Sequence, residues 1–566
     1  MDKDLRHRIE ITHSGAQALI QRGEDHCFDA RDYTLAVAII RNYFALDHAY
    51  QEKSRAIQRL LNRFFSRTEK AKAVLKDAPA SETAPSTPRG TEGEPAREKP
   101  KGHGRNGAAS YTGARKVSVP PPGYQAGDQC PLCPKGKLYS LGDPGVEVRI
   151  VGRAPLEATV YERDKWRCNL CGKVFTPPLP EEAGKEKYDE TAGAMVALLK
   201  YGGGLPFHRL ENLQESLGVP LPASTQWEIV ERTADQIHPV YRELVRQAAQ
   251  GEVLQNDDTT MKILANLKDN DPQDPSSRKG SFTTGVLAVH EERRMALFFT
   301  GPKHAGENME KLLEQRAKDL SPPIQMCDAL SRNVPKEFET LLAHCLTHAR
   351  RNFVDLVPSF PEKCRYVIES LAEVYHHDKM AREQGLSADL RLQFHLAHSG
   401  PVMERLKEWL QTQTQERQAE PNSSLGKAIA YMLKHWEPLT LFLRVPGAPL
   451  DNNLCEQVLK RAILHRKNSL FFRTEHGAYI GDLFMSLIHT CKLNQVNPFH
   501  YLTTLQKHSS ELFKNPRKWL PWNYLQAATH PAYSCQVTRS ALMLRPGTPC
   551  PAARYAALPE GHVYVD

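Results

Sequence analysis

The sequence of 566 residues lacks an apolar run long enough to cross a bilayer, and its charged residues 1–8 lack the apolar stretch of a secretory leader. We therefore expect a cytoplasmic protein without a membrane span. A disulfide framework is also missing, because four of the 12 cysteines form two CxxC pairs and the others are scattered. This distribution is typical of a metal site plus free thiols in a reducing compartment.

Neither sign of charge dominates the composition. Lysine and arginine total 74 against 66 aspartates and glutamates, which gives a net charge of +8 and a pI near 8.7. This modest basic excess is compatible with a polyanionic partner but does not identify one. The length exceeds what one hydrophobic core usually organises, and 40% hydrophobic with 25% charged residues is typical of soluble globular proteins. We predict a multidomain α+β protein.

Residues 32–72 have a heptad-like pattern, with apolar side chains at alternating steps of four and three and one polar exception, Lys53. The seam positions are Ile39, Tyr43, Leu46, Tyr50, Lys53, Ile57, Leu60 and Phe64. This pattern favours either a self-associating coiled coil or an antiparallel helix pair with residues 5–25. Residues 77–128 contain almost no large apolar side chains and are predicted to be a linker. Its basic second half, including Arg105, suits either DNA phosphates or a solvated tether.

Two CxxC sequences predict a zinc ribbon. Thiolates at this spacing form the tetrahedral sulfur site of a structural Zn²⁺, here with Cys130, Cys133, Cys168 and Cys171 as its four ligands. Residues 146–151 and 158–161 alternate as strands do, so we expect a small sheet to bring the two pairs together. Such a ribbon either contacts DNA or only stabilises the fold.

Residues 205–234 predict two helices of helix-turn-helix spacing. The first covers 205–213, a turn with Gly218 follows, and the second begins after Pro222. Many helix pairs share this pattern and bind nothing, so contact with DNA is one of two interpretations.

From residue 252 the pattern becomes extended, and two acids fall where predicted strands end. Three strands, a helix and a fourth strand form the first half of a ribonuclease-H-like sheet, in which the first and fourth strands are neighbours. Asp257 and Asp328 would then meet although 71 positions separate them. The predicted elements are strands at 253–257, 282–289 and 294–300, a helix at about 308–320 and a strand at 324–327.

Glu456, on a helix late in the chain, adds a third carboxylate. Oxygen ligands suit Mg²⁺, and two Mg²⁺ ions can activate a water or 3′-hydroxyl and stabilise the leaving oxygen when a phosphodiester is cut. Each acid also has an alternative interpretation: Asp258 in place of Asp257 as the ligand, Asp328 as a helix cap, and Glu456 as a partner of Lys460. The three acids together carry the prediction of a magnesium site.

Six segments carry a family resemblance. They are 257–260 (DDTT), 345–353 (CLTHARRNF), 449–456 (PLDNNLCE), 466–471 (RKNSLF), 102–106 (GHGRN) and 520–523 (LPWN). They resemble the transposases of the insertion sequence 66 family, and the resemblance runs from the heptad region to about Tyr524. Asp258 and Ala329 depart from the usual Glu and frequent Gly of that family, and neither change removes a required carboxylate.

The resemblance implies a DDE-type DNA transposase that cuts the 3′ ends of an insertion element and joins them to target DNA. Asp257, Asp328 and Glu456 are its implied catalytic residues and ligands of two Mg²⁺ ions. The implied partners are double-stranded DNA, a second copy of the chain and small accessory proteins, and the implied location is the bacterial nucleoid. The alternatives are a DNA-binding regulator that no longer cuts and a structure-specific nuclease.

Basic residues near the predicted site are candidates for phosphate contacts, with structural salt bridges as the alternative. They are Lys460, Arg461, Arg466 and Lys467 on the late helix and Arg350 and Arg351 after the second acid. The pair Cys345 and His348 resembles a CxxH motif that several DDE transposases place after the second Asp. Its alternative is a helix that packs His344 and His348 into the core, and no metal is assigned to it.

The 127 residues between Asp328 and Glu456 predict a helical insertion, with helices at 361–380 and 402–416. His376, His377 and Asp378 within it are expected on a solvated face. The predicted segments are 1–76 (helical, coiled coil), 77–128 (linker), 129–180 (zinc ribbon), 181–250 (helix-turn-helix-like), 251–350 (ribonuclease-H-like catalytic core, first part), 351–445 (helical insertion), 446–510 (catalytic core, second part) and 511–566 (C-terminal segment and tail).

Overall fold

The computed structural model describes residues 13–40, 181–268 and 280–529, together with most of 126–180. The chain divides into two compact units, residues 83–157 and the remainder. In the N-terminal region, helix α1 (His13–Glu24) is followed by helical residues 30–40, and Arg22 donates two hydrogen bonds of 2.9 and 2.7 Å to Asp32 across the turn. Of the predicted heptad seam only Ile39 lies within the described residues. Self-association through this seam therefore stays a prediction.

Short antiparallel ladders flank both CxxC pairs. The amide of Cys130 donates to the carbonyl of Gly136 (2.8 Å), and β1 (Trp166–Arg167) pairs with β2 (Val174–Phe175). Cys133, Cys168 and Cys171 lie outside the described residues, so the zinc ribbon stays a prediction. The strand predicted at 158–161 is wrong, because these residues are irregular and exposed. Only residues 146, 148 and 150 of the stretch 146–151 are described, so the strand predicted there stays a prediction.

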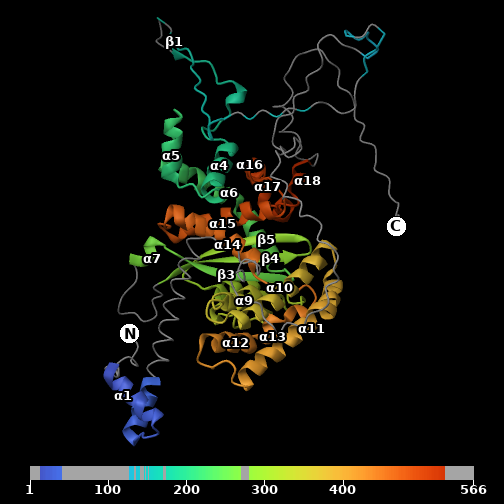
Figure 1. Ribbon diagram of the computed structural model, residues 1–566. Coiled ribbons are helices and arrows are strands. Elements are labelled where there is room, and N and C mark those ends of the chain that lie inside the picture. The colour runs from blue at the N-terminus through green and yellow to red at the C-terminus, as the bar shows by residue number, and fades with distance from the viewer. Residues whose placement is uncertain are drawn as a thin grey trace. The chain divides into compact units, whose positions relative to one another are not determined.

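A five-stranded mixed sheet forms the centre of the larger unit (Figure 1). Its strands are β3 (Val253–Met261), β4 (Ser281–His290), β5 (Arg293–Gly301), β6 (Ile324–Cys327) and β7 (Leu341–His344). The order is β5-β4-β3-β6-β7, with β3, β4 and β5 antiparallel and β6 and β7 parallel to β3. The predicted contact between the first and fourth strands is confirmed. Strand β7 was not predicted, because four residues are too few for a periodic pattern.

Strand β3 is longer than the sequence suggested. Its pairing with β6 ends at Gln255, but its pairing with β4 continues to Met261. Asp257 therefore lies within the strand, and the prediction that it ends a strand is wrong. Beyond Asp257 the backbone N–H and C=O groups of β3 still pair with β4, so the strand continues and does not turn at this residue.

Helices cover the two faces of β4, as the alternation of side chains requires. Asn308 of α8 (Ala305–Leu313) donates to the hydroxyl of Thr284 (2.8 Å). On the other face, Leu459 of α14 (Asn453–Ser469) packs over Gly285, where a Cβ would lie 3.2 Å from the Leu459 side chain. Helix α8 ends at Leu313, several residues before the predicted end.

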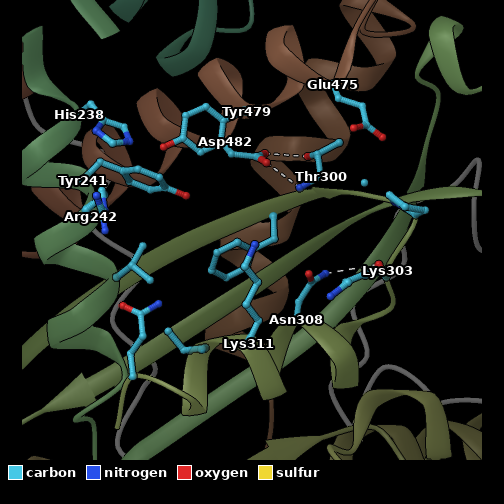
Figure 2. A pocket seen from close by; sticks show the side chains of 16 residues that line it. His238, Tyr241, Arg242, Thr300, Lys303, Asn308, Lys311, Glu475, Tyr479 and Asp482 are labelled. Carbon is cyan, nitrogen blue, oxygen red and sulfur yellow. Dashed lines mark hydrogen bonds between the residues drawn. The ribbon is translucent and has the colours of Figure 1, made fainter. Parts of the chain in front are cut away.

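Helix α15 (Glu475–Leu493) covers the free edge of β5, with one bonding residue just beyond its end. Side chains spaced four residues apart bond to every second backbone amide of the strand, in place of a further strand. They are Asp482 to Thr300 (2.6 Å), Ser486 to Phe298 (3.0 Å), Thr490 to Ala296 (3.0 Å) and Asn494 to Arg294 (3.3 Å). Figure 2 shows the first pair at the wall of a cavity of about 570 Å³ between α6, α8, β5 and α15.

The helical segment before the sheet contains the predicted pair. Helix α5 (Phe207–Ser216) is followed by a turn in which Gly218 has a φ of +76°, and α6 (Ala223–Ala248) follows. Helix α6 extends 14 residues beyond its predicted end at 234 and packs against α4 (Glu190–Ala197) and α15. Its apolar face is therefore buried within the protein.

The helical insertion shares a hydrophobic core with the β6 and β7 end of the sheet, which supplies Ile324, Met326 and Ala343. In Figure 1 its helices lie on the side of the sheet opposite α15. They are α9 (Leu346–Val354), α10 (Pro361–Glu383), α11 (Ala388–Gln415), α12 (Ser424–Lys434) and α13 (Trp436–Leu439).

Two predictions within the insertion are wrong. Helix α11 begins at Ala388 and continues through Pro401, which the sequence suggested as a boundary. Asp378 is not on a solvated face, because it is buried and accepts hydrogen bonds from Arg391 (2.6 Å) while also pairing with Arg382 (2.9 Å). The cations neutralise this carboxylate and so permit its burial.

The remaining elements are short or C-terminal. They are η3 (Glu181–Ala183), η4 (Leu198–Gly202), α7 (Leu264–Lys268), η5 (Ser331–Asn333), η6 (Leu441–Leu443), α16 (Pro498–Lys507), α17 (Ser509–Leu512), η7 (Pro516–Trp519) and α18 (Tyr524–Thr529). Among the described residues, none of the helices combines the length and apolar character that a membrane span requires.

Candidate active site

Strand register brings the first two predicted acids to the same level of the sheet. Gln255 of β3 is paired in parallel with Met326 of β6, and Asp257 and Asp328 each lie two residues beyond this pair. Asp328 directly follows β6 and does not cap a helix. Its Oδ1 accepts hydrogen bonds from the amide of Leu330 (3.2 Å) and from Asn333 Nδ2 (2.5 Å).

Asp257 and Asp258 have different surroundings, because adjacent strand residues face opposite sides of the sheet. The Asp258 side chain is only 2% exposed and lies 2.9 Å from His304 Nδ1 and 3.2 Å from Arg332 Nη2. Its charge is already balanced by these partners. Asp257 faces the side that carries α14, where its charged neighbours are acids.

Glu456 reaches the same place from the first turn of α14. The amide of Cys455 donates to Gln255 Oε1 (3.3 Å), and Asn452 Nδ2 donates to the carbonyl of Asn256 (3.1 Å). These bonds fix the start of α14 to β3 beside Asp257. Among the described residues, Glu456 pairs with His348 (3.8 Å) and not with Lys460, so the alternative interpretation of this acid is not observed.

The electrostatics of Asp257 report the closeness of the three acids. Its pKa is raised to about 7, first because burial penalises the charge and then because the carboxylates of Asp328, Asp258 and Glu456 repel it. A hydrogen bond from the amide of Asp258 opposes the rise. A cation bound among these carboxylates would favour the ionised form of Asp257.

The donor set fits Mg²⁺. All three groups offer hard oxygen ligands, and Glu456 Oε1 is buried without a hydrogen-bond partner among the described residues. The residues present therefore suit one or more Mg²⁺ ions.

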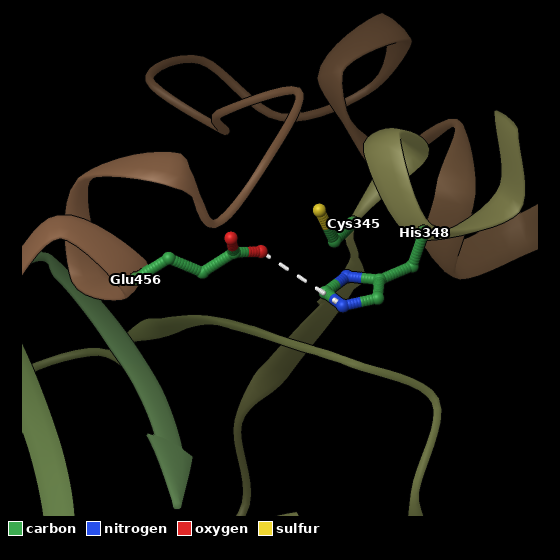
Figure 3. Close-up of side chains that lie close together, drawn as sticks. All are labelled: Cys345, His348 and Glu456. Carbon is green, nitrogen blue, oxygen red and sulfur yellow. Dashed lines mark ion pairs between the residues drawn. The ribbon is translucent and has the colours of Figure 1, made fainter. Parts of the chain in front are cut away.

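A second cluster shares one of the three acids. It consists of Cys345, His348 and Glu456 (Figure 3). One potential ligand atom from each lies within 4.8 Å of the other two. The sequence alternative, a helix carrying both His344 and His348, is wrong because His344 is the last residue of β7. His344 is buried and packs against the ring of His435, and burial lowers its pKa to about 4.

The predicted DNA contacts differ in how accessible they are. Lys460, Arg461 and Lys467 are exposed on α14. Arg466 is half-buried and donates to Thr259 Oγ1 (2.9 Å), so it also holds α14 to the end of β3. Arg350 is only 8% exposed, which leaves little of its side chain for DNA, while Arg351 is half-buried and Arg105 lies outside the described residues. These contacts stay predictions.

Sequence reasoning missed the amides that support the acids. Gln325 Nε2 donates to Asn256 Oδ1 (2.9 Å), and Asn256 Nδ2 donates to the carbonyl of Asn333 (2.8 Å). This buried chain holds β3, β6 and the residue that bonds Asp328. The available signal was the polar residues within otherwise apolar strands, since buried amides need fixed partners.

Comparison with known proteins identifies one family that matches this chain. The sequence profile of the Transposase IS66 family matches residues 185–480, which include the three acids and the CxxH pair. The uncharacterized protein y4jD of Sinorhizobium fredii is 27% identical over 416 residues, covering 69% of this chain and 77% of the relative. The uncharacterized protein y4hP of the same organism is 26% identical over 448 residues, covering 73% and 75%.

Proposed function

Because the chain belongs to the IS66 transposase family, we propose that it cuts the 3′ ends of an insertion element and joins them to target DNA, with Asp257, Asp328 and Glu456 as its catalytic acids. The observation that carries this proposal is the convergence of three carboxylates from β3, β6 and α14. Burial, and then repulsion from these neighbouring acids, raises the pKa of Asp257 to about 7. The sheet order supports the proposal, because a meander of three strands followed by two parallel strands is that of a ribonuclease-H-like core.

The proposed roles follow from the chemistry of the side chains. Asp257 and Asp328 would hold one Mg²⁺ between neighbouring strands, and Glu456 would complete the site from α14. When bound, Mg²⁺ lowers the pKa of a water or 3′-hydroxyl and neutralises charge on the phosphate. Asn333 holds the Asp328 carboxylate in one orientation through its 2.5 Å hydrogen bond. The Gln325, Asn256 and Asn333 amides keep β6 at the level of β3.

The basic side of α14 would position the DNA. Lys460, Arg461 and Lys467 are exposed on the helix that carries Glu456, so a phosphate backbone bound there would pass beside the acids. We further propose that the four ribbon cysteines hold one Zn²⁺ and that two copies of the chain pair the two element ends. Small proteins of the same element would be its accessory partners.

Adjacent aspartates provide a matched test of the proposed site. Purified protein is incubated with DNA carrying the flanks of its gene, in Mg²⁺ or EDTA, as wild type, Asp257→Asn or Asp258→Asn. We expect Mg²⁺-dependent nicks at the repeat ends and joined products from the wild type. Asp257→Asn should lose both products, whereas Asp258→Asn should keep cleavage and lose stability, because Asp258 balances His304 and Arg332.

Other outcomes would contradict the proposal in specific ways. Equal loss of cleavage in both variants would mean that Asp257 is not the specific ligand. Nicks without joined products would indicate a nuclease. Specific binding of the flanking DNA with no nicks in any metal, also after addition of the accessory proteins, would indicate a regulator that no longer cuts.

A further inference from the structure

The Cys345, His348 and Glu456 cluster is built from two helix starts that meet beside the sheet. Cys345 follows β7 directly and is the N-cap residue of α9, which places His348 one turn into that helix. Glu456 comes from the first turn of α14. The amide of Asn452 donates to Cys345 Sγ (3.3 Å), so the sulfur is fixed against the segment that leads into α14.

Two polar atoms of this cluster lack a hydrogen-bond partner within the described part of the chain, although Cys345 Sγ has one. Glu456 Oε1 and His348 Nδ1 are both buried without hydrogen-bond partners among the described residues. Cys345 is 1% exposed, so water does not reach its sulfur freely. Buried polar atoms normally have partners, and a bound ion is one way in which such atoms are satisfied.

The distances fit a transition metal. Bond lengths of about 2.3 Å to sulfur and about 2.0–2.2 Å to nitrogen and oxygen place tetrahedral ligands about 3–4 Å apart. His348 Nε2 and Glu456 Oε1 are already 3.8 Å apart, and the three ligand atoms lie within 4.8 Å of one another. Side-chain rotation would bring the three ligand atoms to these separations.

We propose that Cys345, His348 and Glu456 bind a Zn²⁺-class cation, at a site separate from the predicted ribbon that shares Glu456 with the proposed magnesium site. A thiolate and an imidazole select Zn²⁺ or Co²⁺ over Mg²⁺, which prefers oxygen. Three protein ligands leave one position of a tetrahedral ion open. The ligand set does not depend on the function proposed above.

One consequence rests on that proposed function. Glu456 is also the third catalytic acid, so an ion held by Cys345 and His348 would compete with Mg²⁺ for its carboxylate. Zn²⁺ at this site would therefore inhibit cleavage. The protein would then be active only where free Zn²⁺ is too low to fill the site.

Binding is tested on the full chain without DNA. The protein is first saturated with Zn²⁺ to fill the ribbon, weakly held metal is then removed, and Co²⁺ is titrated in. Co²⁺ bound through sulfur gives a near-ultraviolet charge-transfer band that Mg²⁺ cannot give. We expect this band in the wild type and in Cys364→Ala, which removes a buried cysteine of α10 outside the cluster. Cys345→Ala should lose it.

His348→Ala provides a second variant, because His348 is partly exposed and its truncation should not prevent folding if Cys345→Ala does. Loss of this ligand should weaken Co²⁺ binding by more than the roughly 100-fold that loss of an outer-shell partner can cost. An unchanged affinity in His348→Ala, an unchanged band in Cys345→Ala, or equal loss in Cys364→Ala would each overturn the proposed site.

The inhibitory consequence is measured separately on wild-type cleavage at fixed Mg²⁺. Zn²⁺ should inhibit with the midpoint at which it displaces Co²⁺ from the site. Full cleavage at Zn²⁺ concentrations that saturate the site would refute the competition for Glu456 and leave the binding result intact. Absence of cleavage before any Zn²⁺ is added would count against the proposed function alone.

Discussion

Replacement of Thr490 by valine tests whether α15 acts as the missing neighbour of strand β5. Thr490 is fully buried, and its hydroxyl accepts a hydrogen bond from the amide of Ala296 (3.0 Å) and donates to the carbonyl of the same residue (3.2 Å). Valine has nearly the same shape but cannot make either bond. The change therefore removes the partners of two backbone groups and leaves the packing almost unaltered.

The expected loss of stability follows from the burial of Ala296, which is also fully buried. A buried backbone group left without a partner costs about 1–3 kcal/mol. Two orphaned groups in Thr490→Val should thus lower the free energy of unfolding by about 2–6 kcal/mol. If the edge of β5 were exposed to solvent instead, the same substitution would barely change stability, because water would bond to the two backbone groups in place of the hydroxyl.

The matched control is Thr503→Val in α16. Thr503 is also buried, but its hydroxyl has no hydrogen-bond partner among the described residues, so valine should be neutral or stabilising there. Urea unfolding followed by tryptophan fluorescence compares the two variants with the wild type. Equal midpoints for Thr490→Val and Thr503→Val would refute the role assigned to α15.

Three further changes test other features. Burial raises the pKa of Asp482 to about 7, so its ionisation in the folded state is unfavourable. The free energy of unfolding should therefore fall as pH rises from about 4 through about 7, by up to about 4 kcal/mol. Asp482→Asn should flatten this dependence in urea unfolding, and an unaltered slope would contradict it. Leu470 has a φ of +67° at the end of α14 and is exposed, so Leu470→Gly should raise the free energy of unfolding by about 1 kcal/mol, while a decrease would show that the turn is not strained. Gly285→Val should push Leu459 and α14 away from β4 and so misplace Glu456, lowering cleavage by up to about 100-fold in a protein that still unfolds cooperatively. Wild-type cleavage in that variant would mean that α14 can move without affecting the site.

The sequence predicted the strands of the sheet well because each has a strong local pattern. Apolar runs marked β4 and β5, and the four residues before Asp328 matched β6 at both ends. The limits of β3 could not be read locally, since they depend on pairing with β4 across a separation of up to 36 positions. The prediction for α11 was too short for a related reason. Proline often marks the end of a helix, but packing within the insertion keeps Pro401 inside this one.

In the candidate site, too, some features could be predicted from the sequence and others could not. The acids could be located by motif and strand context, but the choice between Asp257 and Asp258 needed the positions of His304 and Arg332, which no spacing rule provides. The CxxH pair was visible in the sequence, whereas its closeness to Glu456 was not. That contact depends on how α9 and α14 begin, more than 100 positions apart.

The junction between these two helices explains why a long insertion does not disturb the acids. The chain leaves β7 at Cys345 and comes back beside it at Leu450, just before α14, where the amide of Leu346 donates to the carbonyl of Leu450 (3.0 Å). Asn452 is bonded to Cys345 across 107 positions, so the insertion begins and ends at one point. The position of Glu456 relative to β3 is consequently set by this junction and by Gln255, and not by the path of the helices between. An ion bound by Cys345, His348 and Glu456 would lie at this junction, where a small shift of α9 against α14 would move the third acid directly.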